Sequence, residues 1–414
     1  MSNIYRIYAV IYCILALVPL IGGELEIIAT GDIHGSRENF ARLAPLIRAR
    51  KRAIKIDVGD LFHGDPLCDM LNGKPMVDAL NSLNFDIYIP GNHEFELSGS
   101  QSVALFGSFK GEVLGQWSVD GFHPRRWKVV ERNGFRCAII GMSDNGLWRS
   151  RRFYPWMKIV EEFSAVKQAL KEIRKQPVDL IILARHGGNY SGSVPLGKFL
   201  RQYPEIDLVI CGHSHREIVG QRSGRVMIIQ PGALGASAVL ATVRRIGGKT
   251  LHIESRLLRP QADVDPEISA VFARALNSQQ AELDAPALNV VSQSSFAEAV
   301  LKNIRQTLNT DCAVTDLPEL PCGRYTKEQF LKLFPYRNVM AVVTVSRAEY
   351  LNFVREKAPG ERRRFSSEMP ENKENFSVAV NLFQLQRSTV LRSRKDFRLT
   401  GVIERDIILK EHKL

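Results

Sequence analysis

Acidic, amide and histidine residues recur beside glycine along the first half of the chain. The motifs are Gly31-Asp32-Ile33-His34, Gly59-Asp60, Gly91-Asn92-His93-Glu94, His186-Gly187-Gly188 and Gly212-His213-Ser214-His215, with a sixth at Gln230-Pro231-Gly232. Asp-x-His and His-x-His spacing places two side chains on the same side of an extended segment. Carboxylate, imidazole and amide oxygen together suit first-row divalent ions such as Mn²⁺, Fe²⁺, Co²⁺ and Zn²⁺. The motifs therefore predict a metal site.

A site with two ions would support phosphate chemistry. A carboxylate can bridge two ions, and ions about 3.5–4 Å apart can generate hydroxide and stabilise an in-line phosphoryl displacement. Taken singly, a Gly-Asp pair usually marks a turn. The succession of motifs, most of them at the end of an apolar run, favours a metal site instead. The histidines outside the motifs are interpreted as structural or exposed: His63, His123, His252 and His412.

Short β-rich runs stand before most of the motifs and would position them. These runs are Leu25–Ala29, Ile54–Val58, Asp86–Ile89, Arg136–Ile140, Leu180–Ala184 and Leu208–Cys211. Segments of helical period intervene, at Glu38–Arg48, Met76–Leu83 and Glu161–Arg174. This alternation predicts an α/β fold, with the motifs at the carboxyl edge of the sheet. Later strands without helices between them predict an antiparallel portion: Val226–Ile229, Ala238–Val243 and Leu251–Ile253.

The pattern changes near residue 260. Helical segments follow at Glu267–Leu283, Ser295–Leu308, Thr326–Leu333 and Arg347–Glu356. The polar stretch Lys357–Asn375 is typical of an exposed loop. We therefore expect a catalytic domain over residues 24–259 and a second domain over residues 260–414.

Composition limits the class of protein. The chain has 414 residues, of which 45% are hydrophobic and 24% charged, which excludes a disordered chain and allows two domains. The net charge of +12 is spread in small groups without a nucleic-acid motif, so a nucleic-acid polymer is not an expected partner. The excess of Lys and Arg fits either a solvated surface or the steering of anionic substrates.

The N-terminus resembles a secretory signal peptide over residues 1–23. Arg6 precedes the apolar run Ile7–Ile21, and Gly22 and Gly23 follow it. The run is short for a transmembrane span. We expect a secreted or periplasmic protein without a stable membrane span after cleavage, and the alternative is a retained membrane anchor. Cys312 and Cys322 could pair in an oxidising compartment, although their spacing does not show it.

More extended motifs narrow the prediction to a family. They are Gly59-Asp60-Leu61-Phe62-His63-Gly64, Pro66-Leu67, Gly73-Lys74-Pro75, Asn81-Ser82-Leu83 and Gly91-Asn92-His93-Glu94-Phe95. Residues 24–258 resemble the catalytic domain of the calcineurin-like metallophosphoesterases, in particular the secreted 5′-nucleotidase and UDP-sugar hydrolase family. Residues 290–356 are similar to that family's C-terminal domain, at Gly323-Arg324-Tyr325-Thr326 and Phe334-Pro335-Tyr336-Arg337-Asn338. The resemblance implies a four-layered αββα sandwich with a smaller α+β C-terminal domain.

The same resemblance implies a role for each motif residue. Two divalent ions (Mn, Zn, Co or Fe) would be bound, the first by Asp32, His34 and His215, the second by Asn92, His186 and His213, with Asp60 bridging them. His93 and Glu96 are the catalytic candidates, His93 contacting the phosphoryl group and Glu96 orienting it. A hydroxide between the ions would attack phosphorus. The expected partner is a small-molecule phosphate ester, namely a nucleotide. Further candidate substrate contacts are Asn189, Arg324 and Phe334.

Two departures from the family affect what can be expected. The family usually has Asp where this chain has Glu96, which is one methylene longer. Its Asn-Gly-Gly-x-Arg substrate loop is replaced by Thr315–Pro321, and its later Gly-Gly-Asp segment by the region of Arg387–Arg394 and Phe397. The C-terminal domain could therefore retain its fold without the nucleoside pocket. Phe334, Tyr336 and Phe383 are candidates for stacking on a base, although aromatic residues in such segments more often belong to the core.

Two alternatives to a nucleotidase follow from these departures. One keeps the metal site but acts on another substrate, as a phosphodiesterase, a pyrophosphohydrolase or a hydrolase of a non-nucleotide substrate. The other is a non-catalytic metal-binding scaffold. The presence of every expected ligand, together with His93, favours an enzyme over the scaffold.

Overall fold

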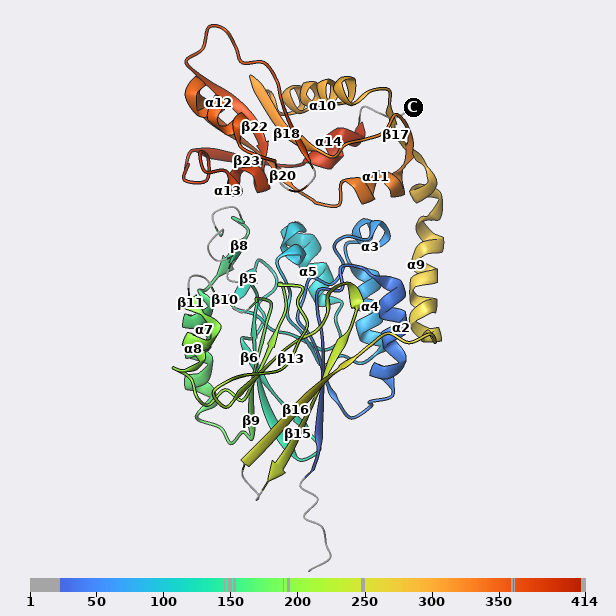
Figure 1. The fold of residues 1–414 in the computed structure, drawn as a ribbon, viewed down its shortest axis with the longest axis vertical. Coiled ribbons are helices and arrows are strands. Elements are labelled where there is room, and N and C mark those ends of the chain that lie inside the picture. Colours follow the sequence, from blue (N-terminus) through green and yellow to red (C-terminus); the bar gives the residue numbers. More distant parts are fainter. Residues whose placement is uncertain are drawn as a thin grey trace, which may run out of the picture.

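The computed structural model describes residues 23–144, 146–147, 151, 154–188, 190–191, 194–246, 250–358, 360 and 362–410. The predicted signal segment lies outside these residues, apart from Gly23. The described chain forms an N-terminal part (residues 23–258) and a C-terminal part (residues 286–410). Helix α9 (Pro266–Asp284) runs along one side of the molecule between them (Figure 1).

Two six-stranded mixed sheets form the N-terminal part. The first has the order β16 (Thr250–Leu258), β15 (Ala238–Ile246), β1 (Leu25–Thr30), β2 (Ile54–Asp57), β3 (Ile87–Tyr88) and β4 (Glu112–Val113). The second has the order β13 (Ile218–Ser223), β14 (Val226–Gln230), β12 (Leu208–Cys211), β9 (Leu180–Arg185), β7 (Phe135–Met142) and β6 (Trp127–Arg132). In the first sheet β1 to β4 are parallel and β15 and β16 add an antiparallel edge. In the second sheet the four central strands are parallel and both edge strands, β13 and β6, are antiparallel.

Side-chain alternation in the strands separates three apolar layers. Leu25, Ile27 and Ala29 of β1 face the space between the two sheets, where they meet residues of β7, β9 and β12. Ile28 faces the opposite way, toward α2 (Arg37–Arg48) and α4 (Lys74–Ser82). On the far sheet, Ala138 and Ile140 face α7 (Glu162–Ile173) and α8 (Leu196–Leu200). The result is helix, sheet, sheet, helix.

Helix α9 fastens the C-terminal part to the first layer. Its N-cap residue, Asp265, accepts hydrogen bonds from the backbone N–H groups of Glu267 and Ile268 and is followed by a proline at the first helical position. Arg48 of α2 also donates to the Asp265 carboxylate. Ile268 and Phe272 of α9 are buried among the residues that cover the first sheet.

A five-stranded sheet forms the centre of the C-terminal part. Its order is β21 (Arg363–Ser366), β18 (Cys312–Leu317), β22 (Asn375–Asn381), β20 (Val339–Ser346) and β23 (Phe397–Ile403). One face packs on α10 (Gln293–Leu308), α11 (Lys327–Leu333) and α14 (Glu404–Lys410), and the other on α12 (Arg347–Arg355) and α13 (Leu382–Arg387). A small ribbon of β17 (Pro286–Val290) and β19 (Gly323–Thr326) adjoins it.

The predicted α/β architecture, four layers and a smaller α+β part, is confirmed. The stretch Lys357–Asn375 was expected to be a loop and instead contains edge strand β21, whose backbone pairs with β18 and whose residues 364–366 are partly buried. Cys312 is buried in β18 and Cys322 is exposed, and both are free thiols. The domain boundary near residue 260 stays a prediction. No helix among the described residues has the length and apolar character needed to cross a membrane.

Candidate metal centre and cleft

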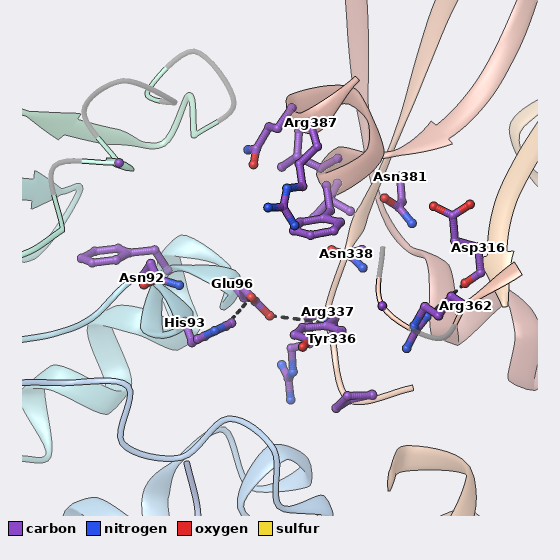
Figure 2. Close-up of a pocket in the computed structure, with 18 of the residues that line it drawn as sticks. Asn92, His93, Glu96, Asp316, Tyr336, Arg337, Asn338, Arg362, Asn381 and Arg387 are labelled. Atoms are coloured by element: carbon purple, nitrogen blue, oxygen red, sulfur yellow. Dashed lines mark hydrogen bonds and ion pairs between the residues drawn. The ribbon is translucent and has the colours of Figure 1, made fainter. Parts of the chain in front are cut away.

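A cleft of about 1170 Å³ lies where the carboxyl edges of the sheets face the C-terminal part (Figure 2). Its N-terminal wall carries residues that directly follow strands, such as Asn92 and His93 after β3, Asp144 after β7 and His213 after β12. The opposite wall comes from the loop before β20 and from α13. Ligand sites of α/β proteins typically occupy this edge of a sheet.

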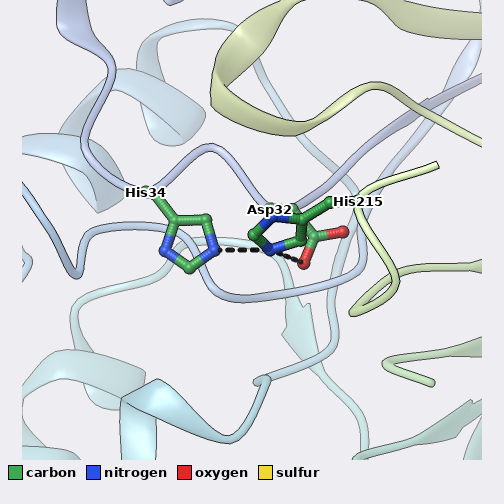
Figure 3. A group of neighbouring side chains, drawn as sticks. All are labelled: Asp32, His34 and His215. Carbon is green, nitrogen blue, oxygen red and sulfur yellow. Dashed lines mark hydrogen bonds and ion pairs between the residues drawn. The ribbon is translucent and has the colours of Figure 1, made fainter. Parts of the chain in front are cut away.

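One group of potential ligands joins the ends of β1 and β12. The Nε2 atoms of His34 and His215 lie 3.1 Å apart, and His215 Nε2 lies 3.8 Å from Asp32 Oδ1 (Figure 3). Asp32 is fully buried, and both of its oxygens accept a hydrogen bond from the backbone N–H of His213. The three ligand atoms therefore converge on one small volume.

A second group adjoins the first through Asp60. His186 Nε2 lies 3.1 Å from Asp60 Oδ2 and 3.2 Å from Asn92 Oδ1, and His213 Nδ1 lies 2.9 Å from the same Asn92 oxygen. Asp60 Oδ2 also lies 3.9 Å from His34 Nε2. Asp60 thus stands between the two groups, where one carboxylate can reach an ion on either side.

The backbone at these residues is strained. Asp32, His34, Asp60, His213 and His215 all have positive φ angles, between 49° and 70°. This left-handed region is unfavourable for residues with a Cβ atom, and such strain clusters at functional sites. The sharp turns bring side chains from separate strand ends to one point.

Backbone carbonyls fix two of the imidazole rings from behind. His34 Nδ1 donates to the His63 carbonyl oxygen at 2.9 Å, and His186 Nδ1 donates to the Val58 carbonyl oxygen at 2.6 Å. The proton on Nδ1 leaves each Nε2 lone pair directed at the cluster, as second-shell partners do for metal-binding histidines. The donor set of imidazole, carboxylate and amide oxygen thus fits a pair of first-row divalent ions.

Glu94 holds the Asp60 loop, a role that its position in the sequence did not reveal. Its buried carboxylate accepts hydrogen bonds from the backbone N–H groups of Asp60 (3.0 Å), Leu61 (2.8 Å) and Gly91 (2.6 Å). Only the three-dimensional structure shows these partners, because two of them lie more than 30 residues away. The signal available in the sequence was an acidic residue next to an expected metal motif.

His93 faces the cluster and is oriented by Glu96. Its Nδ1 atom lies 2.6 Å from Glu96 Oε1, while its Nε2 atom lies 4.0 Å from Asp60 Oδ2. Burial would lower the pKa of His93, but the Asp60 and Glu96 carboxylates raise it to about 10. Burial likewise would raise the pKa of Glu96, but the neighbouring His63 and His93 hold it at about 2. The two side chains therefore form a charged pair.

Electrostatics within the cluster favour added positive charge. Burial would lower the pKa of His186, and the Asp60 and Asp32 carboxylates raise it to about 10, so the carboxylates attract a proton in the metal-free chain. Burial lowers the pKa of His34 to about 4, which leaves its ring neutral and able to ligate. Burial also lowers the pKa of His213.

The candidate substrate contacts are not all brought to the cleft. Phe334 packs in the core of the C-terminal part against Phe330, while Arg324 is exposed on β19, outside the residues that line the cleft. Asn189 lies outside the described residues. Tyr336 and Phe383 do line the cleft, together with side chains that the sequence did not single out: Asp144, Tyr154, Trp156, Asn338, Arg362 and Asn381.

Comparison of the sequence with protein families identifies the one to which the strand-end motifs belong. Residues 25–217 match the model of the calcineurin-like phosphoesterase family. The chain contains a calcineurin-like phosphoesterase domain. All seven of the predicted metal ligands lie within the matched residues of this phosphoesterase domain.

The chain is also similar to individual proteins and to solved structures. It is 25% identical over 238 residues to the 2′,3′-cyclic-nucleotide 2′-phosphodiesterase/3′-nucleotidase of Haemophilus influenzae, an alignment that covers 47% of this chain and 36% of that protein. The chain thus spans about a third of that relative's length.

Two solved structures share the fold at low identity. One is a Staphylococcus aureus protein assigned as a 5′-nucleotidase, with TM-score 0.74 and 18% identity over 93% of this chain and 96% of that one. The other is a 5′-nucleotidase precursor from Thermus thermophilus, with TM-score 0.66 and 16% identity over 93% and 95% of the two chains. Both align with the phosphoesterase domain and the C-terminal part together.

Proposed function

We propose that the chain is a metal-dependent phosphoric ester hydrolase that removes phosphate from nucleotides. The observation that carries the proposal is the convergence of seven ligand-type side chains, two of which, Asn92 and His213, also line the cleft that the C-terminal part faces. Similarity to nucleotide-hydrolysing proteins supports the substrate class. The scaffold alternative is disfavoured because His93 and Glu96 are also in place.

In this proposal each group of ligands binds one divalent ion. Asp32, His34 and His215 would hold the first ion, Asn92, His186 and His213 the second, and Asp60 would contact both. Ions in these positions supply Lewis-acid stabilisation of phosphoryl oxygens and lower the pKa of water. The donor set suits Mn, Zn, Co or Fe in these positions.

The side chain of His93 would act on the phosphoryl group itself. Glu96 accepts a hydrogen bond from Nδ1–H, which leaves Nε2 directed at the cluster. Burial would lower the pKa of His93, but in the metal-free chain the Asp60 and Glu96 carboxylates raise it to about 10, which favours a proton at Nε2. That N–H can donate to a phosphoryl oxygen and stabilise its negative charge in the transition state.

The C-terminal wall would hold the organic portion of the substrate. Phe383 is 37% exposed, and the Arg387 guanidinium lies over its ring at 5.0 Å. A partly exposed aromatic ring at the wall of a cleft can stack on a nucleobase. Asn338 adds an amide donor and acceptor on the same wall. We propose this wall in place of the missing Asn-Gly-Gly-x-Arg loop.

A second candidate activity is hydrolysis of a cyclic or other phosphodiester. The H. influenzae relative is named for a cyclic-nucleotide phosphodiesterase activity. The substrate loop of the 5′-nucleotidase family is replaced here by Thr315–Pro321. The metal groups and His93 would serve either reaction, so the specificity depends on the C-terminal wall.

A phosphate-release screen separates these activities. Purified protein loaded with Mn²⁺, Co²⁺ or Zn²⁺ is offered 5′-nucleotides, 3′-nucleotides, cyclic nucleotides, UDP-sugars and an aryl phosphate. Asp60→Ala is the inactive control, and Asp263→Asn, an exposed acidic position, is the matched control. Preference for 5′-nucleotides supports the proposal, and preference for cyclic nucleotides supports the second activity. No release from any ester would refute both.

A further inference from the structure

The loop Pro335–Asn338, which precedes β20, contacts the pair His93 and Glu96 of the phosphoesterase domain as well as its own C-terminal part. We call it the junction loop. Its Arg337 backbone N–H donates to Glu96 Oε2 at 3.3 Å (Figure 2). The other oxygen of the same carboxylate, Oε1, is 2.6 Å from His93 Nδ1. One carboxylate therefore joins the junction loop to the imidazole that faces the metal ligands.

The length of Glu96 matters for this arrangement. Its two oxygens are engaged in opposite directions, one by the phosphoesterase domain and one by the C-terminal part. An aspartate at this position would withdraw the carboxylate by one methylene. The shorter carboxylate could bond to His93 Nδ1 or to the Arg337 backbone N–H, but with the observed backbone positions it would not reach both.

An aromatic stack provides a second contact between the junction loop and His93. The His63 ring lies parallel to the His93 ring, with centroids 4.2 Å apart and an interplanar angle of 4°. Tyr336 of the junction loop stacks on His63 with centroids 5.2 Å apart. His63 is buried, and neither ring nitrogen has a hydrogen-bond partner among the described residues. Its ring is held by this stack together with the Asp69 and Glu96 carboxylates, whose oxygens lie 3.8 and 3.7 Å from Nδ1.

Two buried arginines fasten the junction loop to α3 (Pro66–Met70) of the phosphoesterase domain. Arg405 Nη1 donates to Asp69 Oδ2 at 2.7 Å and to the Pro335 carbonyl oxygen at 3.2 Å. Arg337 Nη2 donates to the Asp69 carbonyl oxygen. Both arginines and Asp69 are at least nine-tenths buried, so these hydrogen bonds lie in the interior of the interface between the two parts.

We propose that the junction loop positions His93 for catalysis through Glu96. Turnover then depends on docking of the C-terminal part, even for substrates too small to contact the C-terminal part themselves. This inference rests on the proposed phosphohydrolase function. Glu96, Arg337 and Arg405 are positioning residues in this scheme. Their loss lowers the turnover number, because misplacing a catalytic group by about 1 Å can reduce the rate by about 100-fold.

The kinetic test uses a small aryl phosphate, which has no nucleoside to contact the C-terminal wall. The full-length variants are Glu96→Asp and Arg405→Met, with Arg405→Lys as the conservative rescue. Arg394→Met is the matched control, because Arg394 pairs with Glu349 and Asp396 away from the cleft. We expect kcat to fall about 10- to 100-fold in the first two variants while KM and metal content stay unchanged. Arg405→Lys restores part of kcat, and Arg394→Met retains all of it.

A metal-independent measurement tests the coupling without catalysis. Hydrogen exchange of metal-free protein reports the protection of the Arg337 amide, which donates to Glu96. Faster exchange in Glu96→Asp and Arg405→Met, but not in Arg394→Met, supports the coupling. Glu96→Asp keeps a carboxylate, so it serves if Arg405→Met does not fold. Unchanged kcat or unchanged exchange in folded variants would overturn the inference. If wild-type protein cleaves no ester while exchange responds as expected, the proposed function fails and the coupling stands.

Discussion

Replacing Glu94 by glutamine tests whether this side chain holds the Asp60 loop. The carboxylate accepts three backbone N–H groups, at 2.6, 2.8 and 3.0 Å, in a site with no exposed surface. Glutamine has nearly the same shape but presents an NH₂ group in place of one oxygen. At least one backbone N–H then faces another donor and loses its acceptor.

The expected loss of stability follows from these contacts. An orphaned buried donor costs about 1–3 kcal/mol, and hydrogen bonds to a neutral amide are weaker than those to a carboxylate. We therefore expect Glu94→Gln to lower the free energy of unfolding by about 2–5 kcal/mol. The loop that gives Asp60 its φ of 51° would also relax, so metal affinity should fall with stability.

Guanidinium unfolding of the metal-free protein measures this loss, and a metal-binding titration measures the effect on affinity. Glu298→Gln, at an exposed position on α10, is the matched control and should change the unfolding free energy by less than about 0.5 kcal/mol. A Glu94→Gln variant as stable as this control would refute the assignment of Glu94 as the support of the loop.

Three other predictions address catalysis, specificity and pH. His93→Gln should lower kcat by about 100- to 1000-fold with metal content unchanged, as the loss of one transition-state donor does, and retention of wild-type kcat would contradict its role. Phe383→Ala should raise KM for nucleoside monophosphates about 5- to 100-fold, the value of one base–aromatic stack, and leave KM for an aryl phosphate unchanged. Burial raises the pKa of Glu404, whose carboxyl accepts hydrogen bonds from Thr315 and Asn381. The contribution of the protonated carboxyl to stability is therefore full below the usual pKa of glutamate, and it is lost as pH rises through the raised pKa. Unfolding midpoints of wild type and Glu404→Gln should therefore diverge in favour of the variant as pH increases above about 4.5, and parallel curves would contradict this.

Much of the fold could be predicted because its signals are local. The alternation of apolar strands with amphipathic helices is visible in β1, α2 and α7, and the observed bounds agree with the expected ones to within a few residues. Edge strand β21 was missed because its residues, Arg363–Ser366, include a single apolar side chain and therefore show no apolar alternation.

The candidate metal ligands could be placed together because the carboxyl ends of parallel strands meet at one edge. The cleft could not be predicted in the same way. Phe334 and Tyr336 are both aromatic residues in one short motif, yet Phe334 is 5% exposed in the core while Tyr336 is 45% exposed against His63. Which of the two faces the substrate depends on how the C-terminal part docks, and that arrangement follows from buried contacts such as Arg405 with Asp69.

Metal stoichiometry measured together with hydrolysis tests the central proposal most directly. Dialysed wild-type protein is titrated with Mn²⁺ or Zn²⁺ by calorimetry, and phosphate release is followed in parallel for wild type, Asp60→Asn and Asp263→Asn. The proposal predicts two bound ions per wild-type chain, and in Asp60→Asn a loss of tight binding together with loss of hydrolysis. Equal binding and equal hydrolysis in wild type and Asp60→Asn, or no ion bound by the wild-type chain, would contradict it.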